Sequence, residues 1–279
     1  MDSTEKQTKC YEELNRGSGK GCYGKQKPAD SDSLKNLNNK DSSAEISYLI
    51  FSYYGIHIGY DLDVIIYKAA EKAFQYFCRR IAFFGDESVD EKQRIVKETN
   101  RLLAKRIPGL IATAASESGG QLQFDKRHRE ICEELMLLYE RTGGLSFGVA
   151  QRWLNQTLMN LVVIDDCVAL GGVSLEKARK YFHVPVEQNV LRVASEKRRG
   201  RYRNALYLPC APYRDENTGL VQMSWYRHGA TLSFEHWGYR EYMEFQTLIR
   251  ERLKEIVESE QKTYRDPLDW ALQAYIEAA

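Results

Sequence analysis

The chain has 279 residues, of which 43% are hydrophobic and 28% charged, and this length is enough for a sizeable core. The sequence has 40 basic and 39 acidic residues, which gives a formal net charge of +1. This balance excludes recognition of a partner by overall charge, so a nucleic-acid contact would need a local basic group. No run of about 18 apolar residues predicts a membrane span, and no apolar run near Met1 predicts a signal peptide. We therefore expect a soluble, cytoplasmic protein with no membrane contact.

The six cysteines are scattered along the chain and form no C-x-x-C pair. This spacing is typical neither of a zinc framework nor of a small disulfide scaffold, so reduced thiols are expected. No metal site and no cofactor is predicted.

Residues 1–43 are polar and rich in Lys, Asn, Ser, Asp and Gly. Such a segment buries too little apolar surface to offset its ordering entropy, so a disordered tail is predicted. Within it, Gly19–Lys25 resembles the spacing of a phosphate-binding loop, and Leu161–Asp166 has the pattern of a Walker-B strand. No apolar strand precedes Gly19, and Gln26 stands where the loop needs a hydroxyl, so an NTPase is not predicted.

The first folded elements start near residue 46. Residues 46–56 are apolar and aromatic, and their length does not decide between helix and strand. A helix from Asp61 to about Phe84 follows from apolar residues at steps of three and four. Ser88 and Glu91 have capping-box spacing and open a helix that is expected to stop at Pro108. A short apolar piece and a loop to Gly120 should follow.

The next helix is expected from Asp125, as its N-cap, to about Thr142. The stretch from Ser146 to Val168 then predicts a long central helix, with Ser146 as N-cap after two glycines. Because residues 161–164 are apolar on every side, this helix should cross the core and be the most buried element. Its polar residues are expected on the less buried side: Arg152, Asn155, Gln156 and Asn160.

The last third of the chain changes character. A short basic helix is expected from Ser174 to about Phe182, and residues 186–237 predict an irregular or small β insert with a hairpin around 227–230. Helix resumes from about 239 to 257. Asp266 and Pro267 predict a capped terminal helix, docked by Trp270 and Ile276. The fold class is thus mainly α: a single domain, residues 44–279, as a bundle of about six to eight helices around the central one.

A basic run forms the first candidate site. Cationic side chains with one tyrosine among them can neutralise phosphates and offer a stacking face, which favours binding of nucleic acid or a phosphate-bearing ligand. A solvated surface loop is the plainer alternative. Lys177, Arg179 and Lys180 could widen this surface. The predicted nucleic-acid-binding residues are Lys197, Arg198, Arg199, Arg201, Tyr202 and Arg203.

A polar cluster between helices forms the second candidate. It consists of His128, Arg152, Asn155 and Asp165, and it would make the protein an enzyme. His128 lies one helical turn from Cys132 and could share a metal or pair with the thiol. A buried structural thiol is favoured instead, because free cysteines are commonly buried. Asp165 and Asp166 point about 100° apart on a helix and form no close carboxylate pair by themselves; they are more simply expected to face water.

Three functions therefore stay open, and no catalytic residue is assigned. The first is nucleic-acid binding through the basic run. The second is a protein-interaction or scaffold module, with a protein partner or self-association, which presents the aromatic residues of 220–237. The third is an enzyme built on the polar cluster. His183 follows Arg179 by too few residues for an R-x(4–6)-H ribonuclease motif, and no nucleophile elbow, H-E-x-x-H or dinucleotide fingerprint is present.

Overall fold

The computed structural model describes most of the chain from Ser42 onward, and the mainly α prediction is confirmed. The predicted tail, residues 1–43, lies outside the described residues except at its end, where a helix begins at Ser42. The described residues are 42–57, 59–77, 87–116, 120–168, 170, 175–196, 199–208, 211–214, 221–224, 234–259 and 264–279.

Three helices precede the centre of the fold: α2 (Ser42–Tyr54), α3 (Leu62–Phe77) and α4 (Val89–Ala115). The undecided segment 46–56 is thus helical up to Tyr54. Ser88 caps α4 as predicted, since its hydroxyl accepts from the Glu91 N–H. The predicted stop at Pro108 is wrong, because α4 continues through it to Ala115. Burial of Leu110 and Ile111 against the core compensates for the backbone hydrogen bond that proline removes.

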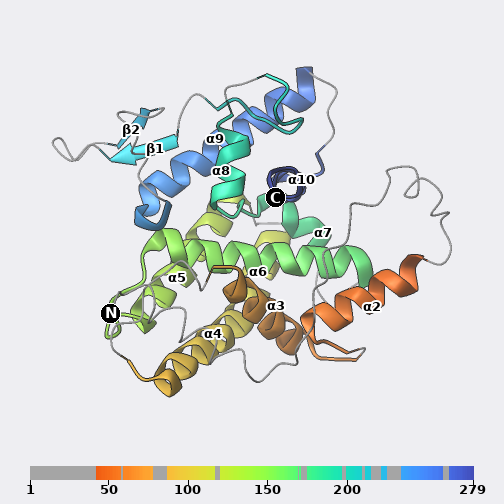
Figure 1. Cartoon of the computed structure of the whole chain (residues 1–279), viewed down its shortest axis with the longest axis vertical. Helices are drawn as coiled ribbons and strands as arrows, with labels where there is room; N and C mark the ends of the chain where they lie inside the picture. The colour runs from red at the N-terminus through yellow and green to blue at the C-terminus, as the bar shows by residue number, and fades with distance from the viewer. Residues whose placement is uncertain are drawn as a thin grey trace, which may run out of the picture.

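Helix α5 (Gln121–Leu138) begins four residues before its predicted N-cap. Gly120 occupies the cap position, and Asp125 lies inside the helix, where its side chain is used elsewhere. Helix α6 (Phe147–Val168) matches the predicted central helix, and the Ser146 hydroxyl accepts from the Val149 N–H at 3.3 Å. Figure 1 shows α6 running across the middle of the molecule, with α2, α3 and α4 on one side and α8, α9 and α10 on the other.

The prediction that the polar residues of α6 face a less buried side is wrong. Every residue from Phe147 to Val162 is buried, the polar ones included. On the side of α2 and α3, Trp153 stacks on Phe74 at 4.8 Å and donates to the Ala70 carbonyl, and Asn160 donates to the Ala69 carbonyl. A buried amide is stable when the fold supplies its partners, and here backbone carbonyls of α3 supply them.

After α6 the described elements are shorter. They are α7 (Leu175–Ala178) with the 3-10 turn η2 (Arg179–Tyr181), α8 (Gln188–Ala194), strands β1 (Ala211–Arg214) and β2 (Val221–Ser224), and η3 (Phe234–His236). Helix α8 was not predicted. The antiparallel pair joins Ala211 to Ser224 and Arg214 to Val221, so the β element exists but lies before the predicted hairpin at 227–230, which falls outside the described residues.

Two helices complete the fold: α9 (Tyr239–Ser259) and α10 (Pro267–Ala278). Asp266 caps α10 as predicted, because its carboxylate accepts from the Asp269 N–H at 2.9 Å. Trp270 is fully buried and docks this helix, whereas Ile276 is 75% exposed, so its predicted docking role is wrong. No described helix combines the length and apolarity that a membrane crossing requires.

Candidate functional site

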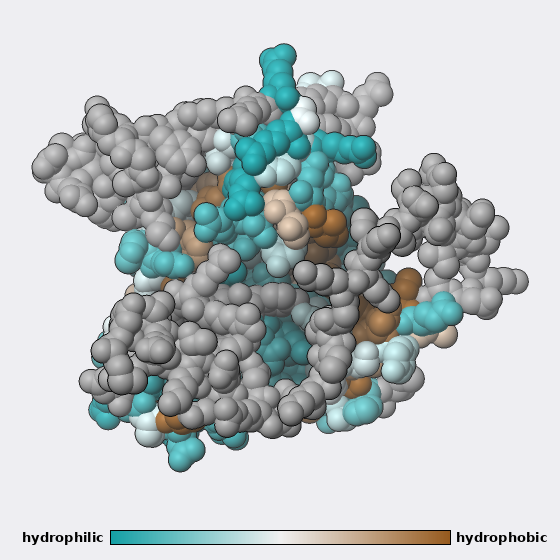
Figure 2. Space-filling view, viewed as in Figure 1, coloured by the Kyte–Doolittle hydropathy of each residue, from teal (hydrophilic) through white to brown (hydrophobic). Residues whose placement is uncertain are grey.

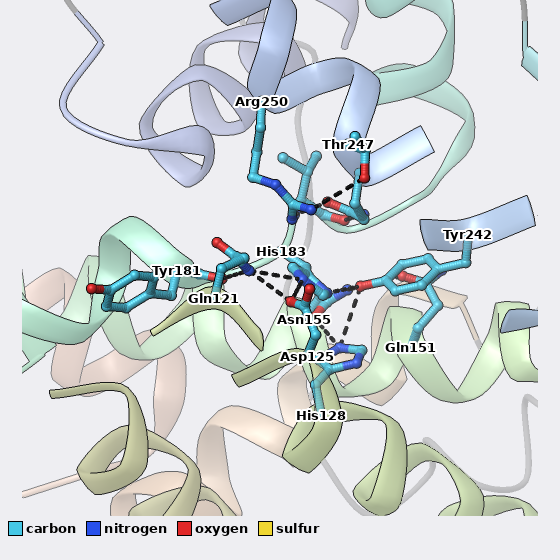
Figure 3. A network of polar contacts seen from close by, with 12 residues as sticks. Gln121, Asp125, His128, Gln151, Asn155, Tyr181, His183, Tyr242, Thr247 and Arg250 are labelled. Carbon is cyan, nitrogen blue, oxygen red and sulfur yellow. Dashed lines mark hydrogen bonds and ion pairs between the residues drawn. The ribbon is translucent and has the colours of Figure 1, made fainter. Parts of the chain in front are cut away.

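A chain of buried hydrogen bonds joins α5, α6, the segment after η2, and α9 (Figure 3). Nε2 of His183 lies 2.7 Å from Oδ1 of Asp125, and Nδ1 of His183 lies 2.7 Å from the Tyr242 hydroxyl. The Asn155 amide donates to that hydroxyl at 2.8 Å, and the Asn155 carbonyl oxygen lies 2.8 Å from Nε2 of His128. We call these five residues the histidine network.

The charges of the histidine network follow from its burial. Burial alone would raise the pKa of Asp125, but the hydrogen bond and charge of His183 outweigh it, and the pKa is lowered. Burial lowers the pKa of His183, although Asp125 partly offsets this. Burial, helped by His183, holds the pKa of His128 well below its usual value, and burial raises the pKa of Tyr242 well above its usual value. One carboxylate is therefore the sole charge among these five groups at neutral pH.

These protonation states allow a single arrangement of hydrogens. An ionised Asp125 only accepts, so His183 donates from Nε2 and accepts from Tyr242 at Nδ1. The tyrosine oxygen then accepts from Asn155, and His128 donates from Nε2 to the Asn155 carbonyl. Sγ of Cys132 lies 3.8 Å from the remaining ring nitrogen of His128. The polar hydrogens of the network thus have acceptors within it, except that the second amide hydrogen of Asn155 is donated to Gln151.

Glutamines extend the histidine network to the backbone. Gln151 accepts from Asn155 at 3.0 Å and donates to the Gly148 and Val186 carbonyls. Gln246 bonds both backbone groups of Val184, and Gln121 donates to Asp125 and to the Tyr181 carbonyl. Segment 181–186, which has no regular secondary structure after Tyr181, is therefore fixed between α5, α6 and α9.

Most polar groups of the histidine network are already hydrogen-bonded, which limits the chemistry that the network can perform. His128, His183 and Tyr242 are fully buried, and both nitrogens of His183 are engaged. The exposed end is the Asp125 side chain, which is 13% exposed. Arg250 of α9 lies above it in Figure 3, and no described group hydrogen-bonds to its buried Nη1 atom. The histidine network therefore holds α5, α6, α9 and segment 181–186 together, and Asp125 is its member with exposed side-chain atoms.

The predicted polar cluster is brought together only in part. His128 and Asn155 are directly bonded. Arg152 instead faces Glu187 at 3.5 Å and lies over the ring of Phe234. Asp165 accepts from the Leu170 N–H near the end of α6. The prediction of one site containing all four residues is therefore wrong, because α6 points Arg152 and Asp165 in directions different from Asn155.

The structure also describes the other residues that the sequence suggested for chemistry, Cys132 and Asp166. Cys132 is buried, and burial raises the pKa of its thiol, as expected of a structural cysteine. Among the residues that the structure describes, no three His, Cys, Asp or Glu side chains are grouped to hold a metal ion. Asp166 does not simply face water, because it pairs with Arg179 at 2.8 Å and with Arg265 at 2.9 Å.

His183 and Tyr242 were not predicted as site residues. Their signals were present, since a histidine inside an apolar segment and an inward-facing tyrosine of a helix each require polar partners. The identity of the partners depends on the packing of segments 59 residues apart, which no local pattern encodes.

The described part of the predicted basic run lies in a loop with no regular secondary structure. We call residues 199–208 the arginine loop; Lys197 and Arg198 lie outside the described residues. Arg199, Arg201 and Arg203 are exposed. Arg201 pairs with Glu196 at 3.2 Å and lies over the ring of Tyr202. Tyr202 itself is half-buried against the core.

The backbone of the arginine loop is tied to the helices behind it. Asn204 donates to Glu277 of α10 from its backbone and its side chain, both at 3.0 Å, and accepts from Tyr264 at 2.9 Å and from Trp270 at 2.9 Å. Arg252 of α9 donates to the Leu206 carbonyl at 3.0 Å. In the space-filling view, hydrophilic side chains project at the top of the molecule, over the region where α8 is drawn (Figure 2).

Of the three residues expected to widen the basic surface, Arg179 is not available to it. Arg179 is buried and pairs with Asp166 and Asp266. Lys177 and Lys180 line an open hollow of about 370 Å³ beside the C-terminal end of α4. Cations at a helix C-terminus complement its dipole, which accounts for these two lysines.

Part of the aromatic surface predicted for 220–237, including Trp225 and Tyr226, lies outside the described residues. Its described aromatic residues, Phe234 and Trp237, are buried in the core. Exposed apolar side chains gather instead on α2, visible beside that helix in Figure 2; they are Ile46, Tyr48, Leu49 and Tyr53.

No family model, no curated protein and no solved structure matches this chain.

Proposed function

We propose that this protein binds nucleic acid through the phosphate backbone, with the arginines of segment 197–203 as the contacting groups. The observation that carries the proposal is that Arg199, Arg201 and Arg203 are all exposed on a loop whose backbone is held by Asn204. Arginine forms forked hydrogen bonds with phosphate oxygens, and a loop already fixed in place loses little conformational entropy on binding.

The acidic groups near the arginine loop leave its arginines able to contact phosphate. Glu196 is turned inward, with 8% of its side chain exposed, and its pair with Arg201 involves a guanidinium that is half in water. Glu277 receives the backbone N–H groups of Arg203 and Asn204. The Arg201 guanidinium has five N–H donors, so it can keep its pair with Glu196 and still offer donors to a phosphate from the solvent side.

The alternatives receive less support from the geometry. The histidine network is saturated and buried, so an enzyme would need a reactive group from elsewhere. The scaffold hypothesis places Phe234 and Trp237 on the surface, but both are buried. The exposed residues of α2 do not identify a partner.

The test is a binding titration with labelled single- and double-stranded DNA and RNA between 50 and 300 mM salt. The variant R199Q/R201Q/R203Q is compared with R101Q/R127Q/R141Q, which removes three exposed arginines of α4, α5 and the turn after it. Both variants lower the net charge by the same amount, so a difference between them reports position.

Wild type and the control variant should bind with affinity that falls steeply with salt. For single strands the slope of log K against log salt changes by about 0.7 for each phosphate contact, so losing three contacts should reduce it by about 2. Absence of binding by the wild type at 50 mM salt, or an equal loss in both variants, would overturn the proposal.

A further inference from the structure

Tyr207 occupies a backbone conformation that tyrosine seldom adopts. Its φ is +52°, and among the described residues it is the one non-glycine with a positive φ. Tyrosine is disfavoured in the left-handed region because its Cβ lies too close to the following carbonyl oxygen, whereas asparagine or glycine adopts this region more readily. Strained residues persist where the surrounding structure imposes them, and they concentrate at functional sites.

The neighbours of Tyr207 impose this conformation. Leu206 and Leu208 are both buried, with exposed fractions of 0% and 2%. The Leu206 carbonyl accepts from Arg252, and the Leu208 N–H donates to the Ala194 carbonyl at 2.9 Å. With the chain fixed on both sides, Tyr207 is held outward and is 39% exposed.

Tyr207 lies near the arginines of the arginine loop. Four residues separate it from Arg203, and an extended chain spans at most about 3.5 Å per residue, so the two α-carbons lie within about 14 Å. Tyr202, which the sequence suggested as the stacking residue, is half-buried under Arg201 and has less ring surface to offer. The exposed ring of the arginine loop is therefore that of Tyr207.

We infer that Tyr207 stacks on an unpaired base, so that the ligand of the arginine loop is single-stranded nucleic acid. This inference rests on the proposed function and adds the substrate class to it. A base inside a duplex has both faces covered by its neighbours, whereas a base of a single strand has a face available for an aromatic ring. Stacking is tolerant of sequence, so every single strand should be bound similarly.

The experiment compares Y207N, Y207F and wild type. Asparagine keeps the left-handed backbone without strain and removes the ring, while phenylalanine keeps the ring. Ligands are a labelled single strand, the same sequence as a duplex, and a single strand of equal length whose sugars carry no bases. Folding stability of each variant is measured by urea unfolding.

Y207N should bind the single strand at least about fivefold more weakly than wild type, the lower bound for loss of one stacked base. It should bind the duplex and the base-free strand as wild type does, and its folding stability should be equal or higher. Y207F should match wild type for all three ligands.

The outcomes separate the inference from the proposed function. If Y207N binds the single strand like wild type while R199Q/R201Q/R203Q does not, the inference is wrong and the proposed function stands. Equal weakening of Y207N toward the base-free strand, or a loss of folding stability, would show that Tyr207 acts by holding the loop and would overturn the inference. If wild type binds none of the ligands, both fail.

Discussion

The Tyr242 hydroxyl lies 2.7 Å from Nδ1 of His183, although 59 residues separate the two along the chain. This bond connects α9 to the irregular segment after η2, and the same hydroxyl accepts from Asn155 of α6. Three parts of the molecule therefore meet at one oxygen atom, which makes this oxygen the most direct point at which to test the histidine network.

The substitution Y242F should lower the free energy of unfolding by about 1–3 kcal/mol, because it leaves buried groups of His183 and Asn155 without a partner while the ring volume is kept. Urea unfolding measures the change. Y239F, which alters a half-buried tyrosine at the start of the same helix, should stay within about 0.5 kcal/mol of wild type. Equal effects would mean that the network adds nothing specific to stability.

Acidification should destabilise the protein through its buried histidines. The pKa values of His128 and His183 are lowered, whereas an unfolded histidine titrates near 6.5. Below about pH 6.5 the unfolded chain therefore binds protons that the folded chain does not, and the unfolding free energy falls by up to about 1.4 kcal/mol per pH unit per histidine. Protonated His183 would also turn a donor toward Tyr242, in place of the acceptor that this bond requires.

Urea midpoints at pH 7.5, 6.5 and 5.5 measure this dependence. H128Q, whose amide can imitate the Nε2–H donor, should have a shallower dependence on pH than wild type, while H57Q, at an exposed histidine, should retain the wild-type dependence. Asp125 acts in a different window: because its pKa is lowered, its contribution to stability is lost only as the pH falls below about 4. A flat wild-type profile from pH 7.5 to 5.5 would contradict the assignment of neutral, buried histidines.

The two arginines that pair with Asp166 should differ in their contribution to stability. Arg179 is buried and also pairs with Asp266, whose side chain is 1% exposed, whereas Arg265 is 60% exposed. R179Q leaves a buried carboxylate uncompensated and should cost about 3–5 kcal/mol. R265Q should cost at most about 1 kcal/mol. Thermal unfolding of both variants under the same conditions gives the comparison, and similar losses would argue against a buried ion pair at Asp266.

Two helical glycines provide a matched pair for the packing of α6. A Cβ at Gly148 would lie 1.8 Å from the Phe234 carbonyl oxygen, whereas a Cβ at Gly109 of α4 meets nothing within 4 Å. G148A should therefore cost about 1–3 kcal/mol or more, because α6 and η3 would have to separate. G109A should be neutral or stabilising by up to about 1 kcal/mol. The unfolding free energies of the two variants test whether η3 is packed on α6 as closely as described.

Local patterns predicted the elements whose determinants are themselves local. Ser88, Ser146 and Asp266 cap their helices because each side chain reaches a backbone N–H three residues away. The central helix was identified as the most buried element from its unbroken apolar run. The burial of Asn155 and Asn160 was not predicted, because their partners lie on α2, α3, α5 and α9. Without those partners a polar residue is expected at the surface.

The elements that were missed depend on tertiary contacts. Pro108 ends an isolated helix but not α4, whose last turns are buried. Helix α8 has seven residues and is capped by Glu187, an unusual capping residue, so its pattern is too short to recognise. Of the predicted polar cluster, the pair His128 and Asn155 was placed correctly, and its continuation to His183, Tyr242 and Asp125 required the fold.

The burial of α6 on every side also constrains the order in which the chain can mature during synthesis. The Asn155 amide finds its partner on Tyr242, which is 87 residues further along, and a ribosome adding about 5–20 residues per second reaches it about 4–17 s later. Until then one flank of α6 lacks α9, while α2 and α3 are already available for the other flank. Nascent chains that end before α9 should therefore remain open along α6 and dependent on chaperones.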